Sequence, residues 1–410
     1  MEDYNLYRLP NGIRIIHKEV KNTRIVHCGF VLDIGSRDEQ PHQQGIAHFW
    51  EHMAFKGTRK RKAFHIINRL ESVGGELNAY TTKEKICFYA SVLEQYFDNA
   101  FELLCDITFD SIFPEKQIER ERNVILEEMA MYYDSPEDAI QDDFESLIFP
   151  NHPLGHNILG TESSVRSFTR ADFKSFIKEN LNTDRIIFSC VGNIKWNNVI
   201  KLAEKYLIDI PVYNAQRQRI LFNNYQASQQ VIHRPLTQTQ VAIGREAYAL
   251  ENPKRIPFFL LVNILGGPGL NSRLNLSLRE KYGFVYSVDA SYTSFTDTGI
   301  LGIFFGTDPK QSEKSNKLVK KELKKLRENS LGTLQLYRAK AQLMGQLAMS
   351  EENNTSLMLM LAKSILDLNR VDTLEEIFEK IELINASDLL EVANEIFEEN
   401  QLSTLTYLPE

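Results

Sequence analysis

Two histidines and a glutamate stand close together in the segment His48-Phe49-Trp50-Glu51-His52. On a helix, residues four apart project from the same face, so the imidazoles of His48 and His52 can bind one metal ion. Glu51 lies beside them, where a carboxylate that is not itself a ligand can act as general base on a water molecule. The segment therefore predicts a hydrolytic zinc site, with His and Glu in the inverse order of the commoner HExxH arrangement.

A third protein ligand is needed, because a catalytic zinc ion usually has three and leaves one position open. The run from Glu121 to Glu128 has a strongly helical pattern, and these two residues lie two turns apart on one face, whereas Glu127 points elsewhere. We expect Glu128 to be the third ligand. The alternative is a row of solvated acids on a charged helix.

Strands and helices with clear boundary signals surround these residues. Gly57 is expected to end the apolar helix that carries the histidines, and Gly74-Gly75 separates a helix from a strand. Ser135 and Pro136 are expected to begin a further helix as its N-cap and first residue. The expected elements are strands over 13–19, 26–34, 77–82, 86–92 and 185–191, and helices over 45–55, 64–73, 113–133 and 171–180.

The second half of the chain repeats this plan. The helix and strand that follow Asp172 parallel those that follow Asp388, and at the same spacing the His48 segment falls on residues 262–266, which contain no His or Glu. We expect an α+β fold of two related halves, each a mainly antiparallel sheet packed with helices on one side. Residues 1–213 would form the catalytic zinc-binding half, 214–226 a polar linker, and 227–410 a non-catalytic half.

Composition excludes several classes of protein. Of the 410 residues, 43% are hydrophobic and 25% charged, which is typical of a globular protein, and the net charge of −8 argues against nucleic acid as a partner. The four cysteines are scattered in apolar settings, which indicates buried thiols and a reducing, cytoplasmic compartment. The opening residues are acidic where a signal peptide is basic, and no apolar run is long enough to cross a membrane.

Five longer segments carry a family resemblance: GIAHFWEHMAFKGT, ESVGGELNAYTTKE, ERERNVILEEMAMYYDSPED, PLGHNILGT and LREKYGFVYSV. They occur in the order found in the pitrilysin (inverzincin) family of metallopeptidases, which includes the mitochondrial processing peptidases and insulin-degrading enzyme, and the chain resembles the short-chain subclass over nearly its whole length. In that family the third ligand is a Glu at the spacing of Glu128, preceded by another at the spacing of Glu121.

The resemblance implies roles for residues outside the histidine motif. Glu121 would support the metal ligands from the outer shell, and one Zn²⁺ would be bound per chain. Arg279 and Tyr286 match the pair that the family's non-catalytic half contributes to binding the peptide and stabilising the tetrahedral intermediate. Without the resemblance, both residues read as ordinary surface or core positions.

Further matches concern substrate binding. Asn78 and Ala79 lie in a strand that resembles the family's edge strand, to which an extended substrate adds as a further strand. Phe55 matches a position that lines the pocket for the side chain just past the scissile bond. Asp138 and Asp142 align with acids by which processing peptidases recognise an Arg near the cleavage point, although an ordinary solvated acidic face is the competing interpretation.

Chain length suggests how the protein assembles. In relatives of this size two chains pair to close a chamber, so the resemblance implies a homodimer, or a heterodimer with a related chain, acting on short or unstructured peptides. Two other functions are compatible with the sequence: a non-catalytic peptide-binding or assembly subunit, and a zinc-dependent hydrolase of a non-peptide amide. The native metal also stays open, because sites with N and O ligands bind several divalent ions.

Overall fold

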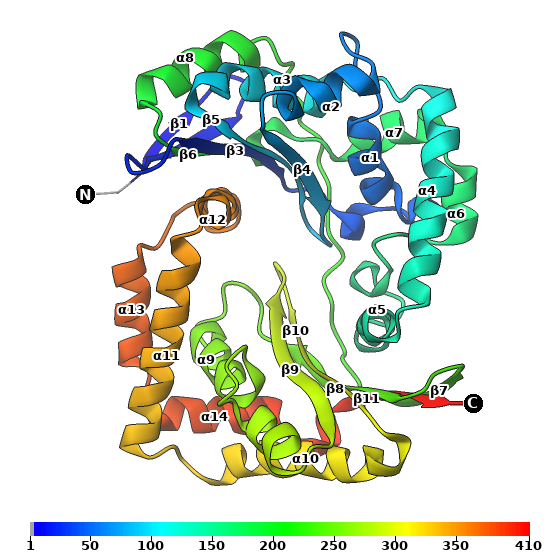
Figure 1. Ribbon diagram of the computed structural model, residues 1–410, viewed down its shortest axis with the longest axis vertical. Coiled ribbons are helices and arrows are strands. Elements are labelled where there is room, and N and C mark those ends of the chain that lie inside the picture. The colour runs from blue at the N-terminus through cyan, green and yellow to red at the C-terminus, as the bar shows by residue number, and fades with distance from the viewer. Residues whose placement is uncertain (1–3) are drawn as a thin grey trace. The chain divides into compact units, whose positions relative to one another are not determined.

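The computed structural model describes residues 4–410, which form two compact units (Figure 1). The acidic residues Glu2 and Asp3, part of the expectation about the N-terminal segment, lie outside the described residues. Each unit is assembled from three segments of the chain. Among the described residues, the first unit consists of 4–129, 156–219 and 349–373, and the second of 130–155, 220–348 and 374–410.

The first unit is built on a six-stranded sheet with the strand order β1-β2-β6-β3-β5-β4. All neighbouring strands are antiparallel except β2 and β6, which are parallel. The strand β4 is the last in this order, so the side of β4 that faces away from β5 forms one edge of the sheet. The strands are β1 (Asn5–Arg8), β2 (Arg14–Glu19), β3 (Ile25–Leu32), β4 (Glu76–Thr81), β5 (Ile86–Leu93) and β6 (Ile186–Gly192).

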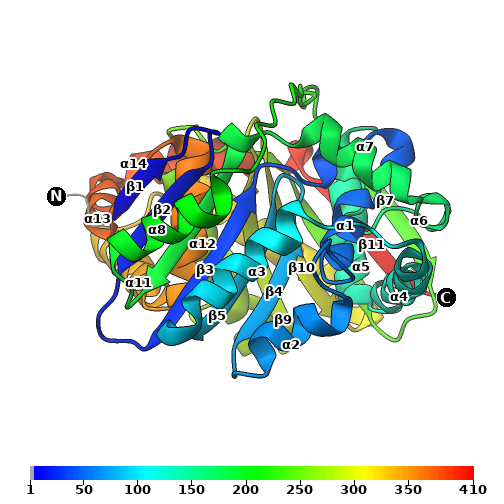
Figure 2. The same cartoon turned by 90° about the horizontal axis from the view of Figure 1, so that it is seen from above.

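Helices cover both faces of this sheet because its central strands are apolar on both sides. Phe30, Phe88 and Phe188 face one core, over which α3 and α8 lie (Figure 2), whereas Val31 and Ile187 face a second core formed with α12. The helices of this unit are α1 (Ile46–Ala54), α2 (Ala63–Glu71), α3 (Phe97–Phe109), α4 (Glu115–Tyr133, of which the last turn belongs to the second unit), α6 (Glu162–Ser167), α7 (Arg170–Asn180), α8 (Trp196–Leu207) and α12 (Asn354–Leu368).

The second unit contains a five-stranded sheet with the order β7-β11-β8-β10-β9. Again one pair is parallel, β7 with β11, and the others are antiparallel. The strands are β7 (Gln229–Arg234), β8 (Thr239–Ala247), β9 (Val285–Ser294), β10 (Gly299–Thr307) and β11 (Ser403–Pro409).

This second sheet is also covered on both faces. Ile243 and Ile303 face a core shared with α9, α10 and α14, whereas Ala242 and Leu405 face a core shared with α5. The helices are α5 (Pro136–Ile148), α9 (Arg255–Gly266), the π-helix η6 (Asn275–Lys281), α10 (Ser312–Glu328), α11 (Thr333–Glu351), α13 (Leu374–Leu383) and α14 (Ala386–Ile396).

The two sheets share one topology. Without β1, the first sheet runs β2-β6-β3-β5-β4, and the second runs β7-β11-β8-β10-β9, with the single parallel pair at the same place. The α+β fold of two related, mainly antiparallel halves is therefore confirmed. The expectation that helices cover only one side of each sheet was wrong, because α12 and α5 cover the second faces.

The compact units do not follow one cut in the sequence. The helix α5 comes from the first half of the chain but packs in the second unit, and α12 comes from the second half but packs in the first. Residues 214–226, all described, form no helix or strand, and 214–219 belong to the first unit. The division of the chain into two halves joined by a linker at 214–226 stays a prediction, which rests on the repeat in the sequence.

Most predicted elements agree with the observed ones to within a few residues. Ser135 is the N-cap of α5 with Pro136 at its start, although the Ser135 hydroxyl donates to the Asp138 carboxylate instead of capping a backbone N–H. All four cysteines are buried free thiols. Within residues 4–410 no helix is both long and apolar enough to cross a membrane.

Candidate metal centre

The helix α1 carries the histidines and begins in an unusual way. Gly45, its N-cap, has φ of 93°, and a Cβ there would lie 2.4 Å from the Leu159 carbonyl oxygen, so the position requires glycine. The buried Glu39 carboxylate accepts hydrogen bonds from the N–H groups of Gly45 at 2.8 Å and Ala47 at 2.9 Å. These bonds satisfy helix N-terminal donors and fix where α1 starts.

The apolar face of α1 fixes its rotation about its own axis. Trp50 is fully buried, and its ring contacts Phe88 and Phe176 at centroid distances of 6.2 and 6.3 Å. Because Trp50 faces the core, His48 and His52 face away from it toward α4. The aromatic residue at this position thus packs behind the histidine-bearing face.

His48, His52 and Glu128 converge on one point. The Glu128 carboxylate lies 3.8 Å from His48 Nε2 and 3.5 Å from His52 Nε2, through its two different oxygens. One ligand atom from each residue can be chosen so that all lie within 4.8 Å of one another. This separation suits three ligands arranged around one metal ion, for which bonds of about 2 Å are typical.

The outer contacts orient His52. Its Nδ1 lies 2.9 Å from a Glu121 oxygen, and the second Glu121 oxygen accepts from Lys56 Nζ at 2.7 Å. Nδ1–H therefore donates to the carboxylate and leaves Nε2 unprotonated toward the shared point. Burial alone would raise the pKa of Glu121, but the hydrogen bonds from His52 and Lys56 hold that pKa below its ordinary value.

The electrostatics favour a divalent cation at this point. Burial, aided by the neighbouring His52, lowers the pKa of His48 to about 3, so the imidazole is neutral and able to ligate. Burial also raises the pKa of Glu128. Three carboxylates, those of Glu51, Glu121 and Glu128, face one ammonium, that of Lys56, and a divalent ion would neutralise the excess. Two imidazoles and one carboxylate are a donor set that suits zinc.

Glu51 is held by a neighbouring strand. The hydroxyl of Thr81, at the end of β4, donates to Glu51 Oε2 at 2.6 Å. Burial raises the pKa of Glu51, and the hydrogen bond from Thr81 partly opposes that rise. A carboxylate with a raised pKa is a better proton acceptor than an exposed one, and here it is fixed beside the three converging ligands.

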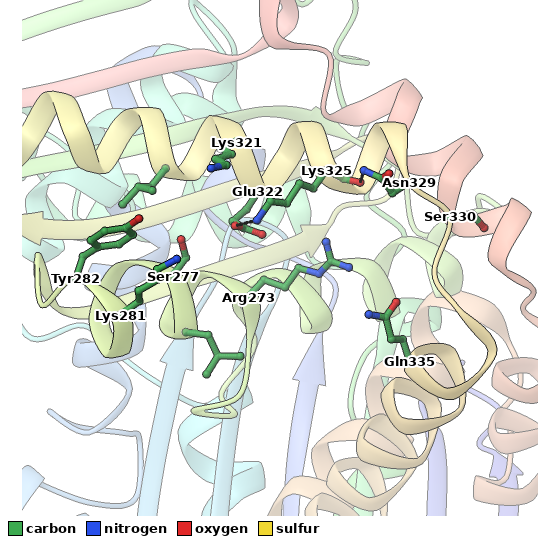
Figure 3. Close-up of a pocket in the computed structure, with 12 residues that line it drawn as sticks. Arg273, Ser277, Lys281, Tyr282, Lys321, Glu322, Lys325, Asn329, Ser330 and Gln335 are labelled. Atoms are coloured by element: carbon green, nitrogen blue, oxygen red, sulfur yellow. Dashed lines mark hydrogen bonds and ion pairs between the residues drawn. The ribbon is translucent and has the colours of Figure 1, made fainter.

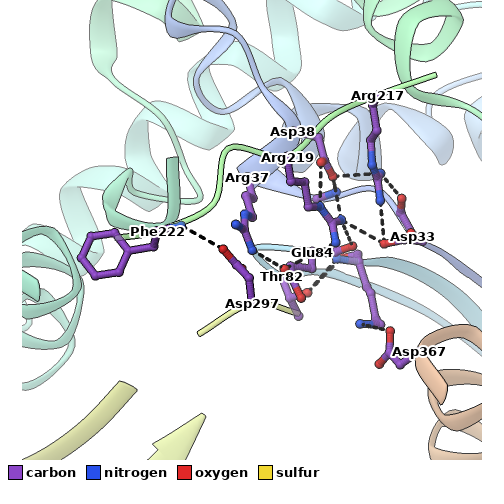
Figure 4. A network of polar contacts seen from close by, with 12 residues as sticks. Asp33, Arg37, Asp38, Thr82, Glu84, Arg217, Arg219, Phe222, Asp297 and Asp367 are labelled. Carbon is purple, nitrogen blue, oxygen red and sulfur yellow. Dashed lines mark hydrogen bonds and ion pairs between the residues drawn. The ribbon is translucent and has the colours of Figure 1, made fainter. Parts of the chain in front are cut away.

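A buried ion-pair cluster supports the loop that leads into α1 and the end of β4 (Figure 4). The Arg219 guanidinium pairs with Asp33 and Asp38, each at 2.9 Å, and donates to the Glu84 backbone carbonyl at 3.1 Å. Arg37 pairs with the Glu84 carboxylate at 2.7 Å. Because Glu39 and Thr81 adjoin these segments, the cluster ties together the two loops that position α1 and Glu51.

The predicted substrate-binding residues of the first unit lie where the sequence indicated an edge strand. Asn78 and Ala79 are in β4, the terminal strand of the sheet, with Asn78 exposed and Ala79 packed toward the core. Phe55 caps the C-terminus of α1, and its half-buried ring lies 6.5 Å from that of Phe88. The ring of Phe55 thus forms part of the packing behind β4 as well as part of the surface.

The remaining predicted residues belong to the second unit. Arg279 lies in η6, and its guanidinium lies 5.8 Å from the ring centroid of Tyr286 at the start of β9. Tyr286 is 87% exposed. Asp138 and Asp142 are on α5, where Asp138 is exposed and accepts from Ser135 at 2.6 Å. The structure therefore brings Arg279 and Tyr286 together.

Sequence reasoning missed three residues of the centre. Lys56 stands one turn after His52, so its contact with Glu121 could have been inferred from helical spacing. Thr81 lies in the predicted edge strand, for which the sequence indicated only backbone pairing with a substrate. Glu39 stands at no helical or strand spacing from the predicted ligands. The contacts of Thr81 and Glu39 depend on how strand and loop pack against α1, which spacing along the chain does not show.

Family models match both halves of the chain. Residues 14–162 match the model described as "Insulinase (Peptidase family M16)", and residues 167–343 match "Peptidase M16 inactive domain". The first match contains every predicted metal ligand. The second contains Arg279 and Tyr286.

Similar proteins cover nearly the full length. A Rickettsia felis protein named "Uncharacterized zinc protease" is 33% identical over 97% of this chain and 95% of its own, and the Bacillus subtilis zinc protease YmxG, also named uncharacterized, is 32% identical over 96% of each. A protease structure from Helicobacter pylori superposes with a TM-score of 0.91 at 22% identity over 99% of both chains. A Pseudomonas fluorescens structure described as a peptidase M16 inactive domain gives 0.92 at 19% identity over 100% of this chain and 98% of that one.

Proposed function

Because the chain belongs to the insulinase family, peptidase family M16, we propose that it is a zinc-dependent endopeptidase that hydrolyses short or unstructured peptides. The family membership confirms the resemblance inferred from the sequence. The observation that carries the proposal is the convergence of His48, His52 and Glu128 within 4.8 Å, with Glu51 fixed beside them.

The proposed mechanism assigns proton transfer to Glu51. Zinc held by His48, His52 and Glu128 would supply a Lewis acid that polarises the peptide carbonyl and acidifies water. Glu51 accepts the proton of the attacking water and passes it to the leaving amine. Thr81 holds the Glu51 carboxylate in one orientation during both transfers.

Substrate binding is proposed to use groups from both units. The edge of β4 around Asn78 and Ala79 would pair with the backbone of an extended peptide, which gives affinity without dependence on sequence. Arg279 would anchor a peptide carbonyl, and the exposed Tyr286 hydroxyl would donate to the developing oxyanion. The proximity of Arg279 to Tyr286 within the second unit supports a joint role of the two side chains.

The family resemblance also supports a proposal about assembly. A homodimer whose chains close a chamber would admit unstructured peptides and exclude folded proteins, and this chain carries every residue type that such a dimer needs. Sedimentation of the zinc-loaded protein tests this part of the proposal. A monomer at the concentrations used for assays would remove it.

The acids of α5 support a preference for basic residues. Asp138 and Asp142 lie on one helix, and Asp138 is exposed. We propose that they favour Arg or Lys before the cleaved bond. A peptide-library cleavage profile without enrichment of Arg or Lys there would refute this preference, and the acids would then be an ordinary solvated face.

One experiment separates the peptidase from the alternatives. Quenched peptides of several lengths should be cleaved by the zinc-loaded protein, inhibited by a chelator, and cleaved again after zinc is restored. Binding without cleavage would instead favour a non-catalytic subunit, for which the match of the second half to an inactive domain is the supporting observation. Cleavage of small amides but no peptide would favour a hydrolase of another amide.

A further inference from the structure

A basic pocket lies in the second unit, apart from the residues of the metal centre. It encloses about 520 Å³ between the η6 segment and α10 (Figure 3). Four cationic side chains line it, and one acidic side chain does. The cations are Arg273, Lys281, Lys321 and Lys325, and the acid is Glu322.

Positive charge collects here although the chain as a whole is acidic, with a net charge of −8. The only carboxylate of the pocket is already engaged, because Glu322 accepts from Lys325 at 2.6 Å. The ammonium groups of Lys281 and Lys321 form no ion pair among residues 4–410. The pocket therefore has more positive charge than its own acid can neutralise.

Arg273 is the cation that least resembles an ordinary surface residue. It projects from the chain just before η6 into the middle of the pocket, between Tyr282 at one end and Gln335 at the other (Figure 3). Burial lowers the pKa of its guanidinium, and the charge of Glu322 partly opposes this, although Glu322 lies beyond ion-pair distance of Arg273 and pairs with Lys325. A partly desolvated guanidinium that shares its one nearby carboxylate with Lys325 leaves positive charge that a bound anion would compensate.

An ordinary structural explanation covers only part of this set. Lys325 lies in the last turn of α10, where cations interact favourably with the helix dipole. That explanation does not apply to Arg273 or Lys281, which come from a different segment and face the same space. Two elements thus contribute cations to one pocket.

The pocket's shape and chemistry restrict the ligand. Its volume is that of a small-molecule site, and Arg forms bidentate hydrogen bonds with phosphate. The lysines along α10 are one turn apart, which suits charges repeated along a short chain. At one end, the ring of Tyr282 is 45% exposed, stacks on Phe284 at 5.3 Å and has the Lys281 ammonium 5.3 Å from its centroid.

We propose that this pocket binds a small molecule that carries two or more adjacent phosphate groups, with Arg273 at the centre and Lys321 and Lys325 along the chain of phosphates. Inorganic polyphosphate and a nucleoside polyphosphate share this chemistry. A nucleoside would in addition stack on Tyr282.

The same segment links the pocket to the proposed peptidase. Arg279 lies in η6 between the pocket residues Ser277 and Lys281, and η6 leads directly to Tyr286 in β9. π-helices are rare and are often found at functional sites. Resting on the proposed function, we expect occupancy of the pocket to order η6 and lower the KM for peptides.

Calorimetry with inorganic tripolyphosphate tests the binding without reference to peptidase activity. The zinc-loaded protein should bind it, Arg273→Gln should weaken binding roughly tenfold or more, and the exposed Lys321→Gln roughly threefold. Lys314→Gln is the matched control, because it removes the same charge from α10 outside the pocket and should leave the affinity unchanged. Zinc content measured afterwards shows that the metal centre is intact.

Several outcomes decide the proposal. No binding at millimolar tripolyphosphate, or equal affinities for wild type, Arg273→Gln and Lys321→Gln, would overturn it. Tighter binding of adenosine triphosphate that Tyr282→Ala abolishes identifies a nucleotide, and equal affinities for both probes identify inorganic polyphosphate. An unchanged KM with the pocket filled would remove the link to η6, whereas absence of hydrolysis under every condition would instead count against the proposed function.

Discussion

The hydroxyl of Thr81 is expected to affect turnover more than substrate binding. Its donation to Glu51 at 2.6 Å lies in the range of strong hydrogen bonds to a carboxylate. Valine has nearly the same shape and suits a strand, so Thr81→Val removes the bond and leaves β4 in place. A hydrogen bond to a charged group contributes about 1.5–3 kcal/mol, which corresponds to a roughly ten- to 150-fold lower kcat if the bond holds Glu51 throughout the reaction.

Steady-state hydrolysis of a quenched peptide measures this effect. We expect kcat to fall in Thr81→Val, KM and zinc content to stay at wild-type values, and Thr81→Ser to restore turnover. Thr82→Val is the control, because the Thr82 hydroxyl contacts Lys85 in the adjoining turn and not Glu51. A kcat within twofold of wild type in Thr81→Val, or an equal loss in Thr82→Val, would refute the positioning role.

Three further changes test other parts of the structure. Glu121→Gln should weaken zinc binding roughly 10–100-fold in competition with a fluorescent chelator, while the exposed Glu127→Gln on the same helix should not, and equal affinities would contradict the outer contact. Glu39→Ala removes the carboxylate that accepts from two N–H groups at the start of α1, so the free energy of unfolding in urea should fall by about 2 kcal/mol or more. An unchanged urea midpoint would contradict the capping role of Glu39. Burial lowers the pKa of His17 in the folded protein, so the unfolded chain binds a proton at a higher pH and stability is lost as pH falls below about 6.5. His17→Gln should therefore show a smaller loss of Tm on acidification than the wild type. The same pH dependence of Tm in both proteins would disprove this.

The convergence of His48, His52 and Glu128 could be predicted from sequence because its geometry is largely local. His48 and His52 share a face through helical spacing alone, and Glu128 follows from its place in a helical run. Thr81 and Glu39 could not be predicted in the same way. Their contacts with α1 depend on strand register and on the loop supported by Arg219, whose partners lie far away along the chain.

The fold shows a similar division. Alternating and helical patterns predicted the bounds of β2, β5 and α7 closely, and the repeat predicted two sheets of related topology. The sheets against which α5 and α12 pack could not be predicted from the sequence. An amphipathic pattern shows that a helix buries one face, but not which sheet it covers, so only the structure shows that these two helices belong to the opposite units.

The most direct test of the central claim is Glu51→Gln. The amide keeps the shape of the side chain and removes the proton acceptor, so the purified variant should still contain one zinc ion per chain while kcat for a quenched peptide falls by roughly 100-fold or more. Glu127→Gln serves as the control with the same chemical change on an exposed residue. Turnover at the wild-type rate by zinc-loaded Glu51→Gln would contradict the assignment of this centre as a peptidase site.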